Sequence, residues 1–252
     1  MTRPELSVQL YTLRDRLEDL PNLAQRLAQI GFTCVEPHRW HENATEVKNA
    51  LQAAGLRAPS AHARILDGDA SQIFSAAVDL GIDTVVQPSS PRELWHSRAG
   101  IRELAQKMNA LAVDARQFGV RVAYHNHAFE FLESNWQSQA GPAQLPTALD
   151  FFAADLSDDV LLQVDTYWAA VGGADPVALL ERLGQRVRLL HIKDGPITGD
   201  PADQLPVGAG KMPVDEILAV APQARPIIEL DDYRGDALDA VQASYEYLAG
   251  RL

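Results

Sequence analysis

Residues 120–127 read VRVAYHNH, an apolar run that ends in two histidines. The first half is typical of a buried β-strand. The second half is not, because a buried polar group costs free energy unless it has a partner. His125 lies on the predicted strand, and His127 faces the same way because side chains of a strand alternate with a period of two. The stretch therefore predicts a core strand whose end carries functional groups.

Similar apolar runs recur along the chain, and segments with apolar residues at helical spacing separate them. The runs lie at residues 6–10, 33–36, 58–62, 84–87, 120–127, 160–165, 187–193 and 226–230. Between the first two runs, Leu23, Leu27 and Ile30 share one face of a predicted helix that stops at Gly31. Strands and helices thus alternate from one end of the chain to the other.

Eight strands alternating with about eight helices in 252 residues predict an α/β fold, the (β/α)8 TIM barrel, as one domain over residues 1–252. A doubly wound open sheet is the competing architecture. That fold usually has a glycine-rich turn after its first strand, and residues 11–16 (YTLRDR) contain no glycine. We therefore favour the barrel.

Composition argues against several classes of partner and site. The 22 Lys and Arg residues are outnumbered by 34 Asp and Glu residues, which gives a net charge of -12. Such a surface repels phosphate backbones and anionic lipid, so we expect no nucleic acid and no membrane as partner. Cys34 is the single cysteine, which excludes an internal disulfide framework and a cysteine-based zinc site. We expect a cytoplasmic protein, and a homo-oligomer stays open.

Nearly every predicted strand ends in a side chain that can bind a ligand. These side chains are Gln9, Glu36, His62, Gln87, His125, His127, Asp165, His191, Lys193 and Glu229. A single His or Gln at such a position more often bonds a nearby backbone group. However, the carboxyl ends of barrel strands meet at one mouth, where the chemistry of this fold takes place. One shared site explains the whole set better than many separate local bonds.

Asp165, His191 and Glu229 are the strongest candidates for metal ligands, because each ends a very apolar run. Two carboxylates and an imidazole suit Mn²⁺, Co²⁺, Zn²⁺ or Mg²⁺. A fourth ligand is expected from the stretch that follows residue 120, where His125 lies on the strand and Glu130 follows a turn.

Seven motifs together resemble one superfamily, the xylose isomerase-like TIM barrels. They are VQLYTLRD (8–15), VEPHRW (35–40), YHNHAFEF (124–131), VDTYW (164–168), HIKD (191–194), VGAGKMPVDEIL (207–218) and IIELDDY (227–233). The superfamily includes sugar phosphate isomerases/epimerases, ketose 3-epimerases, inosose dehydratase and apurinic endonucleases. The resemblance covers essentially the whole chain and lies in the order and spacing of the motifs.

The resemblance implies one divalent metal ion, most often Mn²⁺, held by Glu, Asp, His and Glu from strands five to eight. The last three ligands fall on Asp165, His191 and Glu229. Ketose epimerases have a glutamate on the fifth strand where this chain has His125. The branch with YHNHxFEF takes its carboxylate from a later residue, here Glu130. We predict Glu130 as the fourth ligand, with His125 as the alternative.

The resemblance also implies removal of a proton next to the carbonyl of a carbohydrate through an enediolate. The residues predicted to act in catalysis are Glu130, Glu229, His125, His127 and Lys193. The residues predicted to bind substrate are Gln9, Glu36, His62, Gln87 and Trp168, the last of which stands where epimerases have a histidine. For Lys193, the alternative is a surface lysine paired with Asp194.

Three functional alternatives stay open beside an isomerase or epimerase of a keto-sugar or sugar phosphate. A lyase or dehydratase acting on keto-inositols or 3-keto-glycosides is the nearest, because a histidine pair can protonate a departing oxygen. An apurinic-endonuclease-like phosphodiesterase is disfavoured by the charge, and a non-catalytic barrel is also conceivable. The VGAGKM stretch lacks the spacing and the Ser or Thr of a P-loop, so we expect a loop that covers the pocket.

Overall fold

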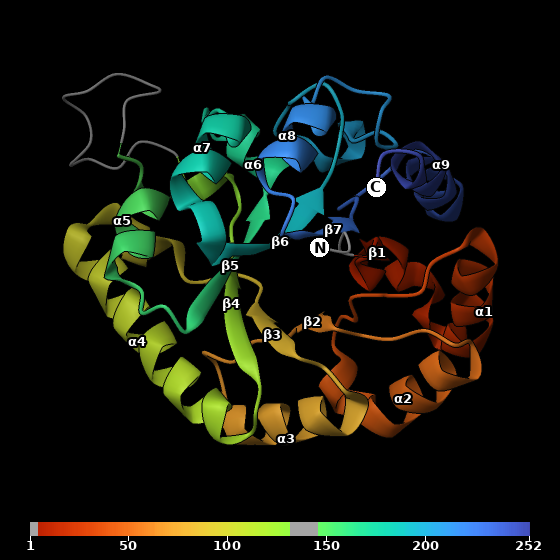
Figure 1. The fold of residues 1–252 in the computed structure, drawn as a ribbon, viewed down its shortest axis with the longest axis horizontal. Helices are drawn as coiled ribbons and strands as arrows, with labels where there is room; N and C mark the ends of the chain where they lie inside the picture. The colour runs from red at the N-terminus through yellow and green to blue at the C-terminus, as the bar shows by residue number, and fades with distance from the viewer. Residues whose placement is uncertain (1–4, 132–145) are drawn as a thin grey trace.

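The computed structural model describes residues 5–131 and 146–252 (Figure 1). Seven parallel strands form one sheet in the order β1-β7-β6-β5-β4-β3-β2. They are β1 Ser7–Val8, β2 Ser60–His62, β3 Thr84–Gln87, β4 Arg121–His125, β5 Val160–Asp165, β6 Val187–Ile192 and β7 Arg225–Ile228. The parallel order follows the chain once around, as a TIM barrel requires.

Residues 33–38 take the position of the remaining barrel strand, between β1 and β2. On one side, Leu10 N donates to Glu36 O at 2.9 Å, and on the other, His62 N donates to Pro37 O at 3.1 Å. The pairing is limited to isolated bridges, and Pro37 has no backbone N–H to donate. The predicted (β/α)8 barrel is confirmed, with this segment as its least regular strand.

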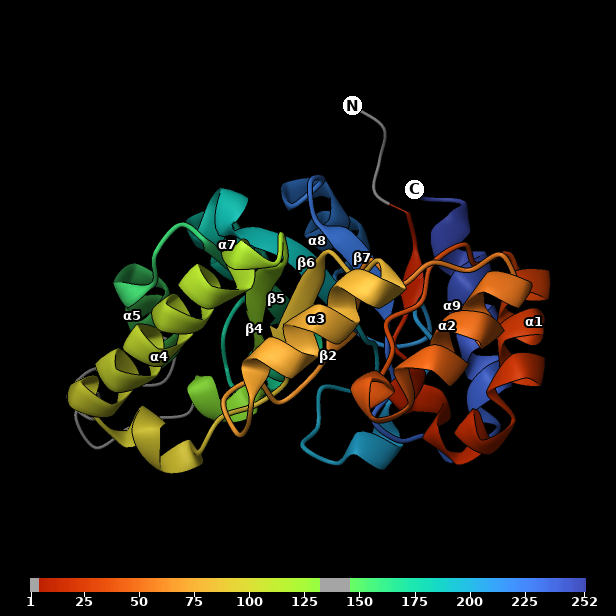
Figure 2. The ribbon, with the colours of Figure 1, turned by 90° about the horizontal axis from the view of Figure 1, so that it is seen from below.

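Helices surround the strands (Figure 1). The α-helices are α1 Leu20–Ile30, α2 Ala44–Ala53, α3 Ala70–Leu80, α4 Arg98–Gln117, α5 Ala148–Asp155, α6 Thr166–Val171, α7 Pro176–Leu183, α8 Val214–Val220 and α9 Ala237–Ala249. Short 3-10 helices are η1 Leu10–Asp19, η2 Trp40–Asn43, η3 Arg92–His96, η4 Ala128–Glu130, η5 Gly184–Arg186 and η6 Pro201–Asp203. Figure 2 shows α2, α3 and α4 side by side along one flank of the barrel. Within the described residues, no helix combines the length and apolarity that crossing a membrane needs.

The two faces of each strand bury different sets of side chains. The large core lies between the helices and the outer faces of the strands. A small second cluster consists of Val86, Ala123, Leu161, Leu189 and Ile227, each one from a different strand. Because these residues come before the strand ends, the polar side chains that follow them are left at the carboxyl end of the barrel.

The prediction that the strand starting at residue 120 continues to His127 is wrong. β4 ends at His125 because the next side chain, Asn126, bonds to the neighbouring strand: its Oδ1 accepts from Asp165 N at 3.0 Å, and its Nδ2 donates to Asp165 O at 3.1 Å. The chain then turns into η4. His127 therefore approaches the mouth from a turn rather than from a strand.

Candidate active site

Four buried side chains at the carboxyl ends of adjacent strands each offer a ligand atom, and these atoms all lie within 4.8 Å of one another. His125, Asp165 and His191 come from β4, β5 and β6, and Glu229 follows β7 directly. The strand register places Asp165 beside His191. The predicted convergence of Asp165, His191 and Glu229 at one mouth is therefore present in the fold.

The two histidines of this group face its carboxylates with different ring nitrogens. His191 Nδ1 lies 2.5 Å from Glu229 Oε2, and its Nε2 lies 2.7 Å from Glu36 Oε1. His125 Nδ1 lies 3.0 Å from Gln163 Oε1, and its Nε2 lies 4.0 Å from Asp165 Oδ2. Glu229 and Asp165 thus face His191 Nδ1 and His125 Nε2, respectively.

Lys193 is fully buried and its ammonium group lies among three carboxylates. Nζ is 2.9 Å from Asp165 Oδ2, 2.8 Å from Glu229 Oε2 and 2.6 Å from Asp231 Oδ2. Burial alone lowers the pKa of Lys193, but these three carboxylates outweigh burial and raise that pKa well above its usual value. Lys193 therefore carries a positive charge at neutral pH inside the mouth, and the alternative of a surface pair with Asp194 does not occur.

The carboxylates at the mouth differ in their pKa values. Burial works to raise the pKa of Glu229, but His191 and Lys193 hold it well below its usual value. Burial raises the pKa of Asp165 to about 6, although Lys193 opposes this shift. Burial also lowers the pKa of His191, yet Glu229 and Glu36 together raise it to about 10. In the metal-free protein, His191 and Lys193 are the cations that balance these acids.

These residues fit a divalent cation. Asp165 Oδ2 is buried and accepts no hydrogen bond of good geometry from the described residues, although Lys193 Nζ lies close to it. Such an oxygen gains from a metal ion, and two imidazole nitrogens with two carboxylate oxygens suit a borderline divalent ion. The residues that would hold the ion are His125, Asp165, His191 and Glu229.

Glu130, predicted as the fourth ligand, lies outside this group. Its Oε1 accepts from Tyr124 Oη at 3.0 Å, and its Oε2 accepts from His127 N at 2.9 Å, so the side chain closes the η4 turn. Burial raises the pKa of this carboxyl well above its usual value. The geometry favours the alternative, His125, as the fourth ligand.

His127 lies at the edge of the mouth and is only partly buried. Its ring centroid is 5.0 Å from that of His125. Burial, and after it the positive charge of Lys193, lower the pKa of His127 to about 4. Burial and the neighbouring His191 also hold the pKa of His125 well below its usual value. Both imidazoles are therefore neutral at pH 7.

The glutamines predicted to bind substrate are bonded to their own surroundings. Gln9 Oε1 accepts from Tyr11 N at 3.1 Å, which caps η1. Gln87 Oε1 accepts from Leu66 N at 3.1 Å, and its Nε2 donates to a backbone carbonyl. Local backbone bonding accounts for both polar atoms of Gln87 and for Gln9 Oε1, whereas Gln9 Nε2 donates to the Glu36 carboxylate.

Glu36, also predicted to bind substrate, lies behind His191 and is fully buried. Its carboxylate accepts from Gln9 Nε2 at 2.8 Å and Ser60 Oγ at 2.5 Å, besides its contact with His191. Burial raises the pKa of Glu36, but His62 and His191 outweigh burial and lower that pKa overall. Glu36 is thus an ionised carboxylate that contacts His191 Nε2 and helps to hold that ring in place.

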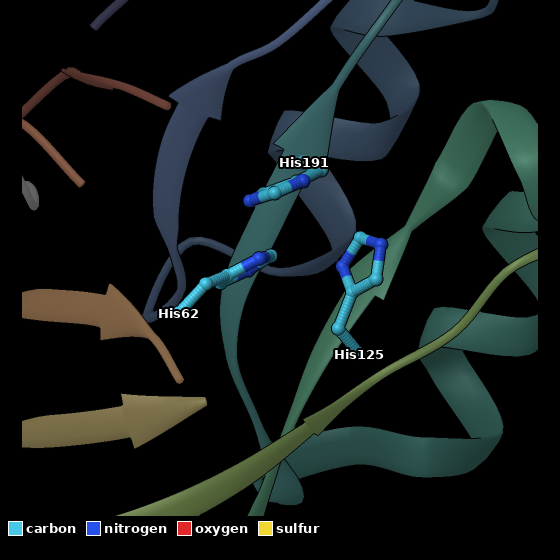
Figure 3. A group of neighbouring side chains, drawn as sticks. All are labelled: His62, His125 and His191. Atoms are coloured by element: carbon cyan, nitrogen blue, oxygen red, sulfur yellow. The ribbon is translucent and has the colours of Figure 1, made fainter. Parts of the chain in front are cut away.

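His62 and Trp168, which were also predicted to bind substrate, lie beside the candidate metal ligands. Figure 3 shows His62 beside His125 and His191, and the rings of His62 and His191 stack with centroids 5.2 Å apart. Trp168 is partly exposed, and its Nε1 donates to Asp231 Oδ2 at 2.9 Å. Both side chains border the group of candidate ligands.

Reasoning from the sequence missed Gln163, Asn126 and Asp231. Gln163 shares the inward face of β5 with Asp165, because the two are separated by two positions. Asp231 follows Glu229 by two positions beyond the end of β7, and its Oδ2 lies 2.6 Å from Lys193 Nζ. This spacing of two was the signal that could have identified both residues.

The glycine-bearing VGAGKM stretch is organised by Asp194. The Asp194 carboxylate accepts from the backbone N–H groups of Gly208, Gly210 and Met212 at 2.9–3.0 Å. A Cβ at Gly210 would lie 2.1 Å from Asp194 Oδ1, so only glycine fits there. These N–H groups bind a carboxylate of the chain itself, which leaves them unable to cradle a phosphate.

Comparisons with known proteins agree with the barrel fold. The family model for the xylose isomerase-like TIM barrel matches residues 24–228. A sugar phosphate isomerase/epimerase from Parabacteroides distasonis ATCC 8503 is 26% identical with a TM-score of 0.76, over 98% of this chain and 94% of that chain. The probable 3-DHS dehydratase AsbF from Bacillus anthracis, involved in petrobactin synthesis, is 14% identical with a TM-score of 0.72, over 98% and 100%.

A third similar structure is a xylose isomerase-like TIM barrel protein from Mycobacterium smegmatis in complex with magnesium. It is 16% identical with a TM-score of 0.69, over 99% of this chain and 96% of that chain. None of the curated proteins matches the chain. The match of the family model over most of the sequence is the deciding result, and the chain belongs to the xylose isomerase-like TIM barrel family.

Proposed function

We propose that the protein is a metal-dependent enzyme that removes a proton next to the carbonyl of a keto-sugar, with epimerisation or isomerisation as the outcome. The observation that carries the proposal is the meeting of His125, Asp165, His191 and Glu229 with the Lys193 ammonium at one mouth. The family membership and the similarity to a structure described as a sugar phosphate isomerase/epimerase support it.

The residues divide into three roles in this proposal. His125, Asp165, His191 and Glu229 would hold a divalent ion, which supplies Lewis acidity towards the substrate carbonyl. Lys193 places a fixed positive charge where the oxygen of an enediolate gains negative charge. His127 is neutral at pH 7 and borders the mouth, so it is our candidate for the base that takes the α-proton.

We further propose that the substrate is not phosphorylated. The backbone N–H groups most suited to a phosphate bond to carboxylates of the chain: Asp194 takes those of the glycine-bearing loop, and Asp236 takes Leu238 N at 2.8 Å at the start of α9. Lys193 in turn is surrounded by acids. A neutral keto-sugar does not need these donors, so the carboxylates that occupy them do not compete with it.

A lyase is the second candidate, because the same proton abstraction leads to elimination when a β-oxygen departs. The similarity to a structure described as a probable dehydratase supports it. The lowered pKa values of His125 and His127 weaken the expectation that this histidine pair protonates the departing oxygen, since neither imidazole is protonated at pH 7. The leaving oxygen would need another proton donor.

Solvent-deuterium exchange tests the proposal. The protein is incubated in D₂O with Mn²⁺, Co²⁺ or Mg²⁺ and a panel of ketoses, their phosphates and keto-inositols. We expect deuterium at an α-carbon of an unphosphorylated member, lost in Lys193→Met but kept in Lys107→Met, a surface lysine paired with Glu103 on α4. Absence of exchange across the whole panel would contradict the enzyme, and exchange confined to sugar phosphates would contradict the unphosphorylated substrate.

A further inference from the structure

We propose that Gln163 is a positioning residue that fixes the tautomer and ring orientation of His125 and His62, and that holds Glu36 against His191. The inference rests on the proposed metal site, since His125 and His191 are two of its four candidate ligands. Gln163 lies inside β5, is fully buried and belongs to none of the groups predicted from the sequence.

The amide of Gln163 lies between one carboxylate and two imidazoles. Its Nε2 is 3.1 Å from Glu36 Oε1 and 2.9 Å from Glu36 Oε2. Its Oε1 is 2.6 Å from His62 Nε2 and 3.0 Å from His125 Nδ1. Every polar atom of this side chain therefore faces the site rather than the backbone.

The chemistry of the neighbours decides which way round the amide stands. Glu36 also receives hydrogen bonds from Gln9 Nε2 and Ser60 Oγ, so it acts as an ionised carboxylate that only accepts. The NH₂ group of Gln163 must therefore face Glu36, because its carbonyl oxygen there would repel the carboxylate. The carbonyl oxygen is then left facing His62 and His125.

A carbonyl oxygen only accepts, so both imidazole nitrogens that face it must carry a proton. His125 is held as the Nδ1–H tautomer, which leaves the lone pair of Nε2 on the side of Asp165. His62 is held with its proton on Nε2, so that nitrogen cannot bind a metal ion. Among the described residues, the trio His62, His125 and His191 (Figure 3) could then hold an ion only through His62 Nδ1, a restriction that does not apply to the group with two carboxylates.

The same amide also acts on His191 through Glu36. Glu36 Oε1 lies 2.7 Å from His191 Nε2, which leaves His191 Nδ1 facing Glu229. A carboxylate behind a metal-binding histidine commonly fixes its ring and tautomer. Here one amide supports both histidines, His125 directly through its carbonyl and His191 through Glu36.

The test uses Gln163→Met, which keeps the length of the side chain but removes its donors and acceptor. Gln163→Glu keeps an oxygen for His125 and removes the donors to Glu36. Gln87→Met is the matched control, because Gln87 is a buried glutamine at the end of β3 whose side chain bonds to the backbone groups Leu66 N and Ser89 O. The first readout is the ¹⁵N chemical shifts of the histidine rings in metal-free protein, with His125→Gln to assign the signals.

We expect a single Nδ1–H tautomer for His125 in the unmodified protein, in Gln87→Met and in Gln163→Glu, and a tautomer mixture in Gln163→Met. The second readout is the affinity for Mn²⁺ or Co²⁺, which should fall roughly 10- to 100-fold in Gln163→Met and stay unchanged in Gln87→Met. An Nε2–H tautomer of His125 in the unmodified protein would overturn the inference. An unchanged tautomer together with unchanged affinity in Gln163→Met would do the same.

The tautomer measurement needs neither metal nor substrate, which separates this inference from the proposed function. If the tautomers behave as stated while no substrate exchanges deuterium, the positioning role stands and the enzyme proposal fails. If Gln163→Met does not fold, Gln163→Glu and the unmodified protein still decide the tautomer of His125.

Discussion

The strand ends of the two halves of the barrel carry similar polar residues but differ in what those residues contact. In the half formed by β4 to β7, His125, Asp165, His191 and Glu229 face one another. In the half formed by β1 to β3, the ends of the strands carry Gln9, Gln87 and His62, whose side chains bond to the backbone, to Glu36 or to Gln163. A polar residue at a strand end therefore marks the mouth, but only its contacts tell whether it faces a ligand or supports a neighbour.

The largest expected effect in the β4–β7 half is that of Lys193→Met on the metal-free protein. The change leaves the buried Asp165 and Glu229 and the partly buried Asp231 without their ammonium group, and breaking a buried pair in this way costs about 3–5 kcal/mol. Urea unfolding with a chelator present should show this loss, and added divalent metal should recover part of it. Lys107→Met on the surface should change the free energy of unfolding by less than about 0.5 kcal/mol. Equal unfolding midpoints for the two variants would show that the Lys193 ammonium does not stabilise the acids of the β4–β7 half.

Asp165→Asn should weaken binding of Mn²⁺ or Co²⁺ at least about 100-fold, or about 2.7 kcal/mol, because a charged ligand oxygen is lost. Titration calorimetry measures this loss. Asp79→Asn, at an exposed position of α3, is the matched control and should bind metal like the unmodified protein. If Asp165→Asn kept its affinity for the metal ion, the metal site could not lie at the strand ends of the β4–β7 half.

The free energy of unfolding of the metal-free protein should depend on pH because of His191, which lies in the β4–β7 half. Its pKa is raised from 6.5 to about 10, so the stabilisation that it contributes is fully present below pH 6.5 and is lost as the pH rises towards 10. We expect the free energy of unfolding to fall by an amount on the order of 2 kcal/mol between pH 6.5 and about pH 8. His191→Gln should remove this slope. A flat profile in the unmodified protein would show that His191 is not held as a cation.

The smallest expected effect belongs to the β1–β3 half. Gln87→Met should lower the free energy of unfolding by about 1–2 kcal/mol, because Leu66 N loses its buried acceptor. Affinity for metal should change less than about threefold, which is within 0.7 kcal/mol. Denaturant titration and calorimetry on the same sample measure both quantities. A large loss of metal affinity would show that the two halves do not differ in the way proposed.

Several elements could be predicted from the sequence because their causes are local. The apolar runs and their helical partners gave the barrel, and Asp165, His191 and Glu229 stood out because each follows a strongly apolar strand. The end of β4 could not be predicted in this way. It depends on the bonds of Asn126 to Asp165, 39 positions later in the chain.

The choice between His125 and Glu130 as the fourth metal ligand also depends on contacts in the folded structure. Both residues are polar, and both follow the same apolar run, so the sequence favours neither by pattern. The bonds of Glu130 with Tyr124 and with His127 N direct its carboxylate into the η4 turn, while His125 stays on the strand that faces Asp165. Gln163 was overlooked because a single glutamine within an apolar run looks like part of the core.

The sequence by itself determined the alternation of strands and helices and the set of acids and imidazoles at the strand ends, since both follow from the order of apolar and polar residues. Only the tertiary structure decided which of these side chains meet, where Lys193 lies and which nitrogens of the histidines face the site. Those features depend on atoms brought together from distant parts of the chain, as in the contacts of Gln163 with Glu36 and His62. A linear pattern holds no record of such contacts, because the folding of the barrel creates them.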